Sequence, residues 1–160
     1  MTKFAAMENG PPTLLIVEDN EDDIFFMERI FKQMGARCDL RFVRDGVEAV
    51  EYLSGKGQFE DRVQNPLPTI ILMDLKMPRM NGFEVLEWMQ KQPEIKLIPT
   101  IVVTSSTMQE DVTRAYRSGA NAVMNKPVDK DSLLQMLKTF HLYWTDYVEM
   151  PEVKPAQALD

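Results

Sequence analysis

The sequence predicts a doubly wound α/β fold, a parallel sheet of about five strands with helices on both faces. Two observations support this prediction. Short apolar runs rich in β-branched residues alternate with segments whose apolar residues recur every three or four positions, as on one helix face. Most of the runs are apolar throughout, so both faces of the sheet must be covered, and strands that alternate with helices pair in parallel.

Composition limits the class of protein. The chain has 160 residues, enough for one domain with a core. Acidic residues outnumber basic ones by 25 to 18, which argues against a nucleic-acid-binding surface. No apolar run approaches the roughly 18 residues of a membrane span. The single Cys38 indicates a reducing cytoplasm, and the single His141 excludes a site built from several histidines.

The first half of the chain gives two strands and two helices. A capping pair of Asp45 and Glu48 begins the second helix, and glycines and prolines mark the long loop after it. The expected elements are a strand at 13–17, a helix with Ile24, Met27, Phe31 and Met34 ended by Gly35, an edge strand at 38–42, a helix at 45–53 and a loop at 54–68.

The second half repeats this order. The expected elements are a strand at 69–73, a helix from Gly82 closed by Pro93, a strand at 100–104, a helix capped by Thr107 and Glu110 and ended by Gly119, a strand at 122–124 and a helix through Leu133, Leu137 and Phe140. We expect one domain at 13–148 with a C-terminal helix extension, and flexible tails at 1–12 and 149–160.

Five polar side chains directly follow the predicted strands or end them. In an open parallel sheet the ligand site lies beyond the carboxyl ends of the strands. Three carboxylates, one hydroxyl and one ammonium group are therefore expected on one rim: Glu18, Asp19, Asp74, Thr104 and Lys126.

The charge of this rim predicts its ligand. Two carboxylates about 5 Å apart repel by roughly 3 kcal/mol at an effective dielectric of about 20. Hard carboxylate oxygens select Mg²⁺, Mn²⁺ or Ca²⁺, and a small site with few ligands favours Mg²⁺. With the metal and Lys126, the rim can accept a phosphoryl group. A carboxylate is a nucleophile for phosphoryl transfer, and Asp74, central among the candidates, is the best placed.

Several motifs resemble the receiver domain of two-component response regulators in order and spacing. They are LLIVEDN, ILMDLKMPRMNG, IVVTSS and NKP, and the similarity covers roughly 13–140. Asp74 and Thr104 lie 30 positions apart, and Thr104 and Lys126 lie 22 apart, both typical of that family.

The resemblance implies a flavodoxin-like strand order, 2-1-3-4-5, and a role for each site residue. Asp74 would be the phosphoacceptor, Thr104 the switch hydroxyl, and Lys126, before a cis Pro127, the contact to the phosphoryl group. Mg²⁺ would be held by Glu18, Asp19, Asp74 and the backbone carbonyl of Lys76. Such a protein is not an enzyme with a separate catalytic domain but catalyses its own phosphorylation and dephosphorylation.

A narrower resemblance is to the small stand-alone receivers that partner bacterial phytochromes. It rests on VRDGVEAVEYL, the long polar loop, GAN with KPVD, and WTDYVEMP. The implied partner is a sensor histidine kinase of the phytochrome type. One departure from the wider family is Val123, since an aromatic residue usually stands three positions before the lysine. The usual aromatic rotamer switch is therefore not expected.

The sequence leaves three further points open. About twenty residues follow the last helix stripe, so output is expected through protein binding, self-association or a relay. A homodimer through Leu142, Tyr143, Trp144, Tyr147, Val148 and Met150 competes with a helix end that folds back on its own core. The alternative function is a haloacid-dehalogenase-like Mg²⁺ phosphatase, but Lys76 stands where that class needs a second Asp. A flavodoxin-like cofactor binder lacks its phosphate loop.

Overall fold

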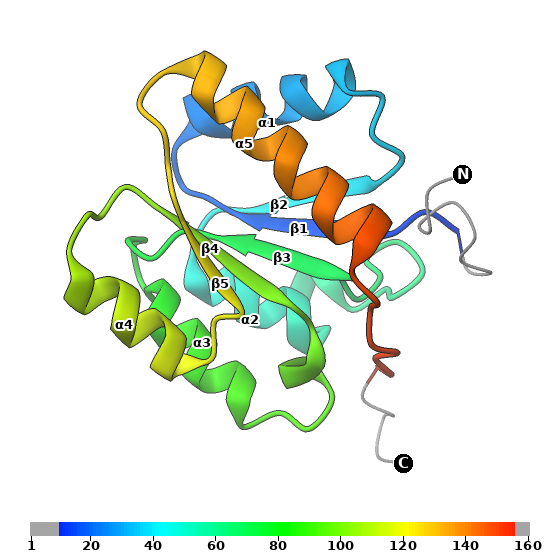
Figure 1. Ribbon diagram of the computed structural model, residues 1–160. Helices are drawn as coiled ribbons and strands as arrows, with labels where there is room; N and C mark the ends of the chain where they lie inside the picture. Colours follow the sequence, from blue (N-terminus) through cyan, green and yellow to red (C-terminus); the bar gives the residue numbers. More distant parts are fainter. Residues whose placement is uncertain (1–9, 156–160) are drawn as a thin grey trace, which may run out of the picture.

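Five parallel strands form one sheet in the order β2-β1-β3-β4-β5 (Figure 1) in the computed structural model, which describes residues 10–155. The strands are β1 (Thr13–Val17), β2 (Asp39–Val43), β3 (Ile70–Met73), β4 (Thr100–Thr104) and β5 (Ala122–Asn125). The helices are α1 (Glu21–Gln33), α2 (Gly46–Ser54), α3 (Gly82–Gln90), α4 (Gln109–Ser118) and α5 (Lys130–Leu142). The predicted fold class and strand order are confirmed.

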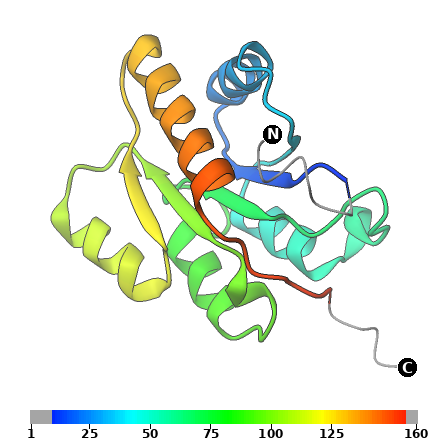
Figure 2. The same cartoon turned by 45° about the vertical axis from the view of Figure 1, so that its right-hand side comes forward.

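Helices cover both faces of the sheet because its central strands are apolar on both sides. Along β1, Leu14 and Ile16 join the core cluster under α1 and α5, whereas Leu15 and Val17 join the cluster under α2, α3 and α4. Figures 1 and 2 show this division of the helices. Because the central strands are buried and parallel, the residues that directly follow them lie at one edge of the sheet.

Side-chain caps fix where most helices begin, and hence the loops at that edge. Asn20, Asp45 and Asp129 each accept a hydrogen bond from the backbone N–H three residues later. Asn81 and Glu84 form a reciprocal capping box at the start of α3. The expected cap at Asp45 is confirmed, but Glu48 accepts from Arg44 N at 2.8 Å and not from Asp45 N as a reciprocal partner would.

The start of α4 differs from the expectation of a capping box at Thr107 and Glu110. The N-cap residue is Met108, and it makes no side-chain cap hydrogen bond. Instead Ser106 Oγ accepts from Met108 N at 3.3 Å and donates to Asp111 at 2.5 Å. The prediction was wrong because Ser106, one residue before the expected cap, takes over the interaction with this helix start.

The expected long loop after α2 is present and is anchored by Arg62. Its guanidinium donates to the carbonyls of Tyr52, Leu53 and Asn65 at 2.7–3.1 Å, and so satisfies acceptors at the end of α2. The Tyr52 hydroxyl donates to Pro66 O at 2.9 Å. The loop also contains a short 3₁₀ turn, Gly57–Phe59.

The chain beyond α5 crosses from one side of the sheet to the other. A π-helical turn follows at Tyr143–Tyr147, and Trp144 packs against the core under α1 and α5. Val153 packs against the opposite cluster, and Lys154 N donates to Glu94 at 3.0 Å. Residues 1–9 and 156–160, which include most of the expected tails, lie outside the described residues.

Within residues 10–155 no helix combines the length and the apolar character that crossing a membrane requires.

Candidate functional site

The three predicted carboxylates lie together at the carboxyl edge of the sheet. Val17 and Met73 are neighbours across the β1–β3 pair, so the residues that follow them emerge side by side. One carboxylate oxygen from each of Glu18, Asp19 and Asp74 lies within 4.8 Å of the others. This convergence was expected from the sequence, because each residue comes directly after a buried strand.

Burial makes the charge of this cluster costly. Glu18 is 3% exposed, and desolvation raises the pKa of both Glu18 and Asp74. For Asp74, the neighbouring charge of Asp19 adds to this effect. A divalent cation offsets such a set of charges, and carboxylate oxygens are hard ligands that suit Mg²⁺ or Mn²⁺. The residues present therefore fit a metal ion.

The carboxylate of Asp74 is oriented by the backbone that follows it. Its Oδ1 accepts from Leu75 N at 2.7 Å and from Lys76 N at 3.4 Å. Its Oδ2 accepts no hydrogen bond from any of the described residues. One oxygen is thus fixed by two N–H groups, and the other is available to a metal ion or a phosphorus atom. The expected ligand role of the Lys76 carbonyl stays a prediction.

Lys126 lies at the rim, and its ammonium group contacts two carboxylates. Nζ lies 2.6 Å from Glu18 Oε2 and 2.7 Å from Asp23 Oδ2, and the Lys126 side chain is 12% exposed. Burial lowers the pKa of Lys126, but the hydrogen bonds to Asp23 and Glu18 outweigh it and leave that pKa raised. Every described peptide bond is trans, including Lys126–Pro127, so the expected cis bond is not found. An X–Pro bond prefers the trans form over the cis form by only a small free energy. Here the Lys126–Pro127 bond is trans while Lys126 forms both ion pairs.

Asp23 is the site residue that sequence reasoning missed. It lies in the first turn of α1, where acidic residues interact favourably with the helix dipole. Its partner Lys126 is 103 positions away, so no local pattern could have indicated the contact.

Thr104 is connected through hydrogen bonds to the start of α4. Thr104 is 1% exposed, and its Oγ1 accepts from Ser106 N at 3.1 Å. Ser106 in turn contacts Met108 and Asp111, as described above. A change at the Thr104 hydroxyl therefore reaches the first turn of α4.

Val123 has an aromatic neighbour from α4. Val123 N donates to the Tyr116 hydroxyl at 3.2 Å, and the Tyr116 side chain is 50% exposed. The Tyr116 hydroxyl of α4 thus contacts the backbone of β5 at Val123. Sequence reasoning placed Tyr116 on this helix but gave it no role at the sheet edge.

A cavity of about 470 Å³ opens beside the carboxylates. Asp19 lines it together with residues of the β3–α3 loop, and two cationic residues, Lys76 and Arg114, also line it. The guanidinium of Arg114 lies 4.1 Å above the Phe83 ring, which holds it at the wall. A small anionic reactant has both space and positive charge here.

Comparison with known proteins identifies a family and several relatives. The family model described as response regulator receiver domain matches residues 14–138. The response regulator Rcp1 of Synechocystis sp. is 31% identical over 143 residues, covering 89% of this chain and 95% of Rcp1. The crystal structure of its Mn²⁺-bound form matches with a TM-score of 0.81 at 30% identity, covering 89% of this chain and 100% of that chain.

Two further solved structures are similar over nearly the same length. The response regulator RPA3017, in red light signaling of R. palustris, has a TM-score of 0.84 at 30% identity, covering 89% of this chain and 99% of its own. The phosphorylated cyanobacterial phytochrome response regulator RcpA has a TM-score of 0.82 at 28% identity, covering 88% and 99%.

Proposed function

Because the chain belongs to the response regulator receiver domain family, we propose that it accepts a phosphoryl group from a sensor histidine kinase on Asp74, with Mg²⁺ bound. The chain matches a receiver domain and is a phosphoacceptor; the matches give no support to a haloacid-dehalogenase-like phosphatase. The observation that carries the residue assignment is the group of three carboxylate oxygens within 4.8 Å, with Asp74 Oδ1 held by two N–H groups.

The geometry suits an in-line transfer to Asp74. Oδ2 attacks the phosphorus of a phosphohistidine, the new O–P bond forms, the P–N bond breaks, and its electron pair stays on the imidazole nitrogen. A bound Mg²⁺ would neutralise carboxylate charge and draw the phosphoryl oxygens towards Asp74. Lys126 and the Thr104 hydroxyl then supply positive charge and a hydrogen-bond donor to those oxygens. The same groups serve the later hydrolysis, in which water attacks the phosphorus, the O–P bond to Asp74 Oδ2 breaks, and inorganic phosphate leaves with the protons of the water.

The proposed donor is a histidine kinase of the phytochrome type. Relatives of this chain include a phytochrome response regulator and one in red light signaling, and the similarity covers nearly their whole length. We propose a cytoplasmic location, which suits the single Cys38, whose pKa burial raises to about 11. A net charge of −7 disfavours nucleic acid as the target of the signal.

Phosphotransfer should depend on a divalent ion and on Asp19. A phosphorylated phytochrome-type kinase is expected to label the wild-type chain with Mg²⁺ and to lose this activity in EDTA. Asp19→Asn should raise the Mg²⁺ concentration for half-maximal labelling by about tenfold, because one of three charged ligands is lost. Asp39→Asn, outside the site, is the control. Equal Mg²⁺ dependence of Asp19→Asn and wild type would contradict the proposed metal site.

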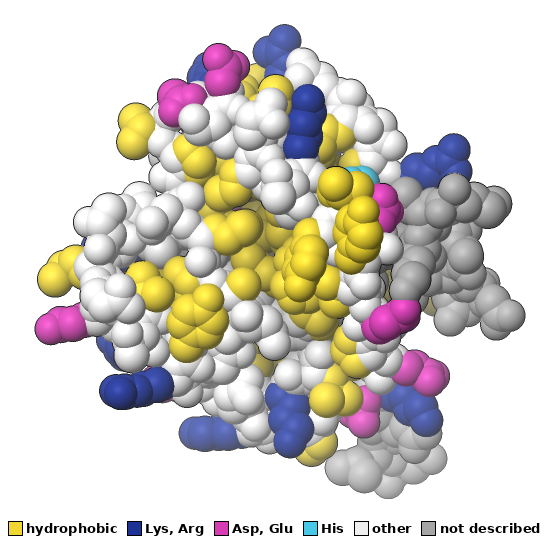
Figure 3. Space-filling view, viewed as in Figure 1, with side chains coloured by type: hydrophobic (Ala, Val, Ile, Leu, Met, Phe, Trp, Pro, Cys, Tyr) yellow, Lys and Arg dark blue, Asp and Glu magenta, His cyan; other side chains and the backbone are white. Residues whose placement is uncertain are grey.

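We also propose that the C-terminal region mediates a homodimer. Leu142, Tyr143 and Tyr147 are 51%, 55% and 70% exposed at the end of α5, whereas Trp144 packs on the core. Figure 3 shows apolar side chains gathered between α5 and α4 and along the C-terminal segment. The segment thus folds back in part and leaves aromatic surface for a second copy.

Sedimentation of a double variant tests this surface. Tyr143→Ser with Tyr147→Ser should weaken self-association about tenfold or more, because buried aromatic side chains dominate such interfaces. Val63→Ser removes a comparably exposed apolar side chain in the 54–68 loop and should leave association unchanged. If the double variant associates as strongly as wild type, the dimer is not formed through this region.

A further inference from the structure

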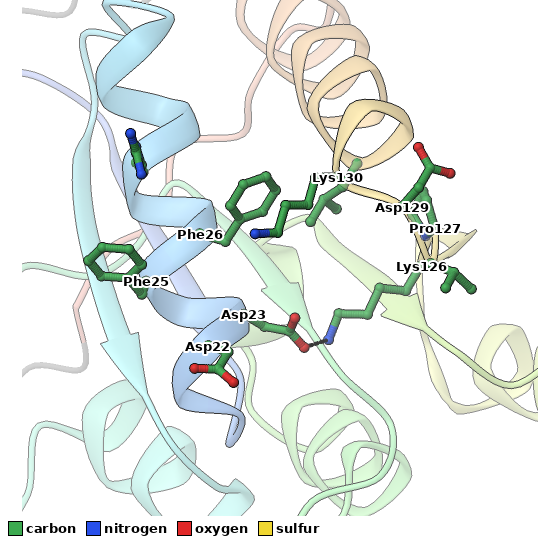
Figure 4. A pocket seen from close by; sticks show the side chains of 11 residues that line it. Asp22, Asp23, Phe25, Phe26, Lys126, Pro127, Asp129 and Lys130 are labelled. Atoms are coloured by element: carbon green, nitrogen blue, oxygen red, sulfur yellow. Dashed lines mark hydrogen bonds and ion pairs between the residues drawn. The ribbon is translucent and has the colours of Figure 1, made fainter.

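The ion pair between Asp23 and Lys126 lies at the base of a cleft between α1 and α5. Figure 4 shows the two side chains pointing towards each other across this cleft, one from α1 and one from the loop before α5. The cleft encloses about 360 Å³ and is also lined by Phe26 and Lys130. No reaction step described above uses Asp23.

We propose that Asp23 is a positioning residue that retains Lys126 until a phosphoryl group arrives, and that breaking this ion pair loosens the first turn of α1. The proposal rests on the proposed function, because Asp74 must be the group that is phosphorylated. It adds a residue that sets how readily the phosphorylated state forms, and a route from the site to α1.

The charges at the rim support this role. The Lys126 ammonium has three donors, and two of them contact Glu18 and Asp23. A metal ion held by Glu18 would compete with Lys126 for that carboxylate, and Asp23 would then be the remaining partner of Lys126. A phosphoryl group on Asp74 then has to draw Lys126 from Asp23. The strength of the Asp23 contact therefore opposes formation of the phosphorylated state.

The same contact joins two elements. Asp23 lies in the first turn of α1, and Lys126 follows the last residue of β5. A second contact across the cleft places Lys130 Nζ 5.1 Å from the centre of the Phe26 ring. Met27 and Ile30 are buried in the core. Because these contacts lie further along α1, release of Lys126 should loosen the first turn and leave the rest of the helix in place.

Asp22 offers a matched control within the same turn. It carries the same charge, lines the same cleft and, within residues 10–155, forms no ion pair; in Figure 4 it points away from Lys126. Asp22→Asn and Asp23→Asn thus change the charge of the α1 terminus equally. Only Asp23→Asn removes an ion pair to Lys126.

The test is the affinity of the full chain for beryllofluoride, a phosphoryl mimic, with Mg²⁺, measured by fluorine NMR. Asp23→Asn should bind the mimic about three- to fivefold more tightly than wild type, as expected when a partly exposed ion pair no longer has to be broken. Asp22→Asn should bind like wild type, and Asp23→Glu should restore wild-type affinity. Hydrogen exchange in residues 21–24 should rise with the mimic in wild type and be high already in free Asp23→Asn.

Two results would overturn the proposal in different ways. Equal affinities of Asp22→Asn and Asp23→Asn, or weaker binding by Asp23→Asn, would refute the role of Asp23 and leave the proposed function intact. A wild-type chain that binds no beryllofluoride in Mg²⁺ would refute both.

Discussion

Asp74→Asn should abolish covalent phosphorylation of this protein. With acetyl phosphate and Mg²⁺, the wild-type chain is expected to gain a single labile phosphoryl adduct in intact-mass spectrometry, and the variant none. The amide keeps the size of the side chain but is a poor nucleophile, so the O–P bond cannot form. Asp22→Asn, which keeps the three site carboxylates, should be labelled like wild type. An adduct of unchanged abundance in Asp74→Asn would rule out this acceptor.

The same substitution should stabilise the metal-free protein at neutral pH. Burial raises the pKa of Asp74 in the folded state above its ordinary value. Its contribution to stability is therefore fully present below the unfolded-state pKa and is lost as the pH rises through the folded-state pKa. Asp74→Asn does not ionise, so its free energy of unfolding should exceed that of wild type at pH 7. The difference should shrink towards acid pH and in Mg²⁺.

Thr104→Ala should remove most of the response of α4 to a phosphoryl mimic, whereas Val123→Ala should preserve it. The Thr104 hydroxyl, which would turn towards a phosphoryl oxygen, accepts from Ser106 N, and Ser106 contacts Met108 N. Val123 has too little bulk and too restricted a χ1 to act as a lever. We expect a coupling free energy of about 1–3 kcal/mol.

Hydrogen exchange of residues 106–112 with and without beryllofluoride measures this response. Thr104→Ser keeps the hydroxyl and should respond like wild type, which separates loss of the donor from a packing effect. A response that survives in Thr104→Ala and disappears in Val123→Ala would show that the route through the loop is wrong.

The sequence was sufficient for the fold and the carboxylate cluster because both follow from local patterns. A fully apolar strand such as Ile70–Met73 must lie inside a parallel sheet, and the first polar residue after it must then emerge at the carboxyl edge. The same rule placed Glu18 and Asp19 next to Asp74. The charge of the three groups then indicated a divalent cation before any distance was known.

What the sequence did not reveal depends on side-chain contacts that local patterns do not specify. Asp23 in α1 contacts Lys126, which follows β5, and Tyr116 in α4 contacts Val123 in β5. The cap of α4 was misplaced because Ser106, next to the expected cap Thr107, makes the hydrogen bonds at this helix start. The C-terminal segment folds back on the core in part, since Trp144 packs there and Tyr147 is exposed, and the homodimer stays a prediction.

Phosphorylation of Asp74 is tested most directly by identifying the modified residue in the unaltered protein. After treatment with acetyl phosphate and Mg²⁺, borohydride reduces an aspartyl phosphate to homoserine, and peptide mass spectrometry then locates that residue. We expect homoserine at position 74 alone, and no homoserine when EDTA replaces Mg²⁺. Homoserine at position 19 or at any other aspartate, with Asp74 unchanged, would contradict it.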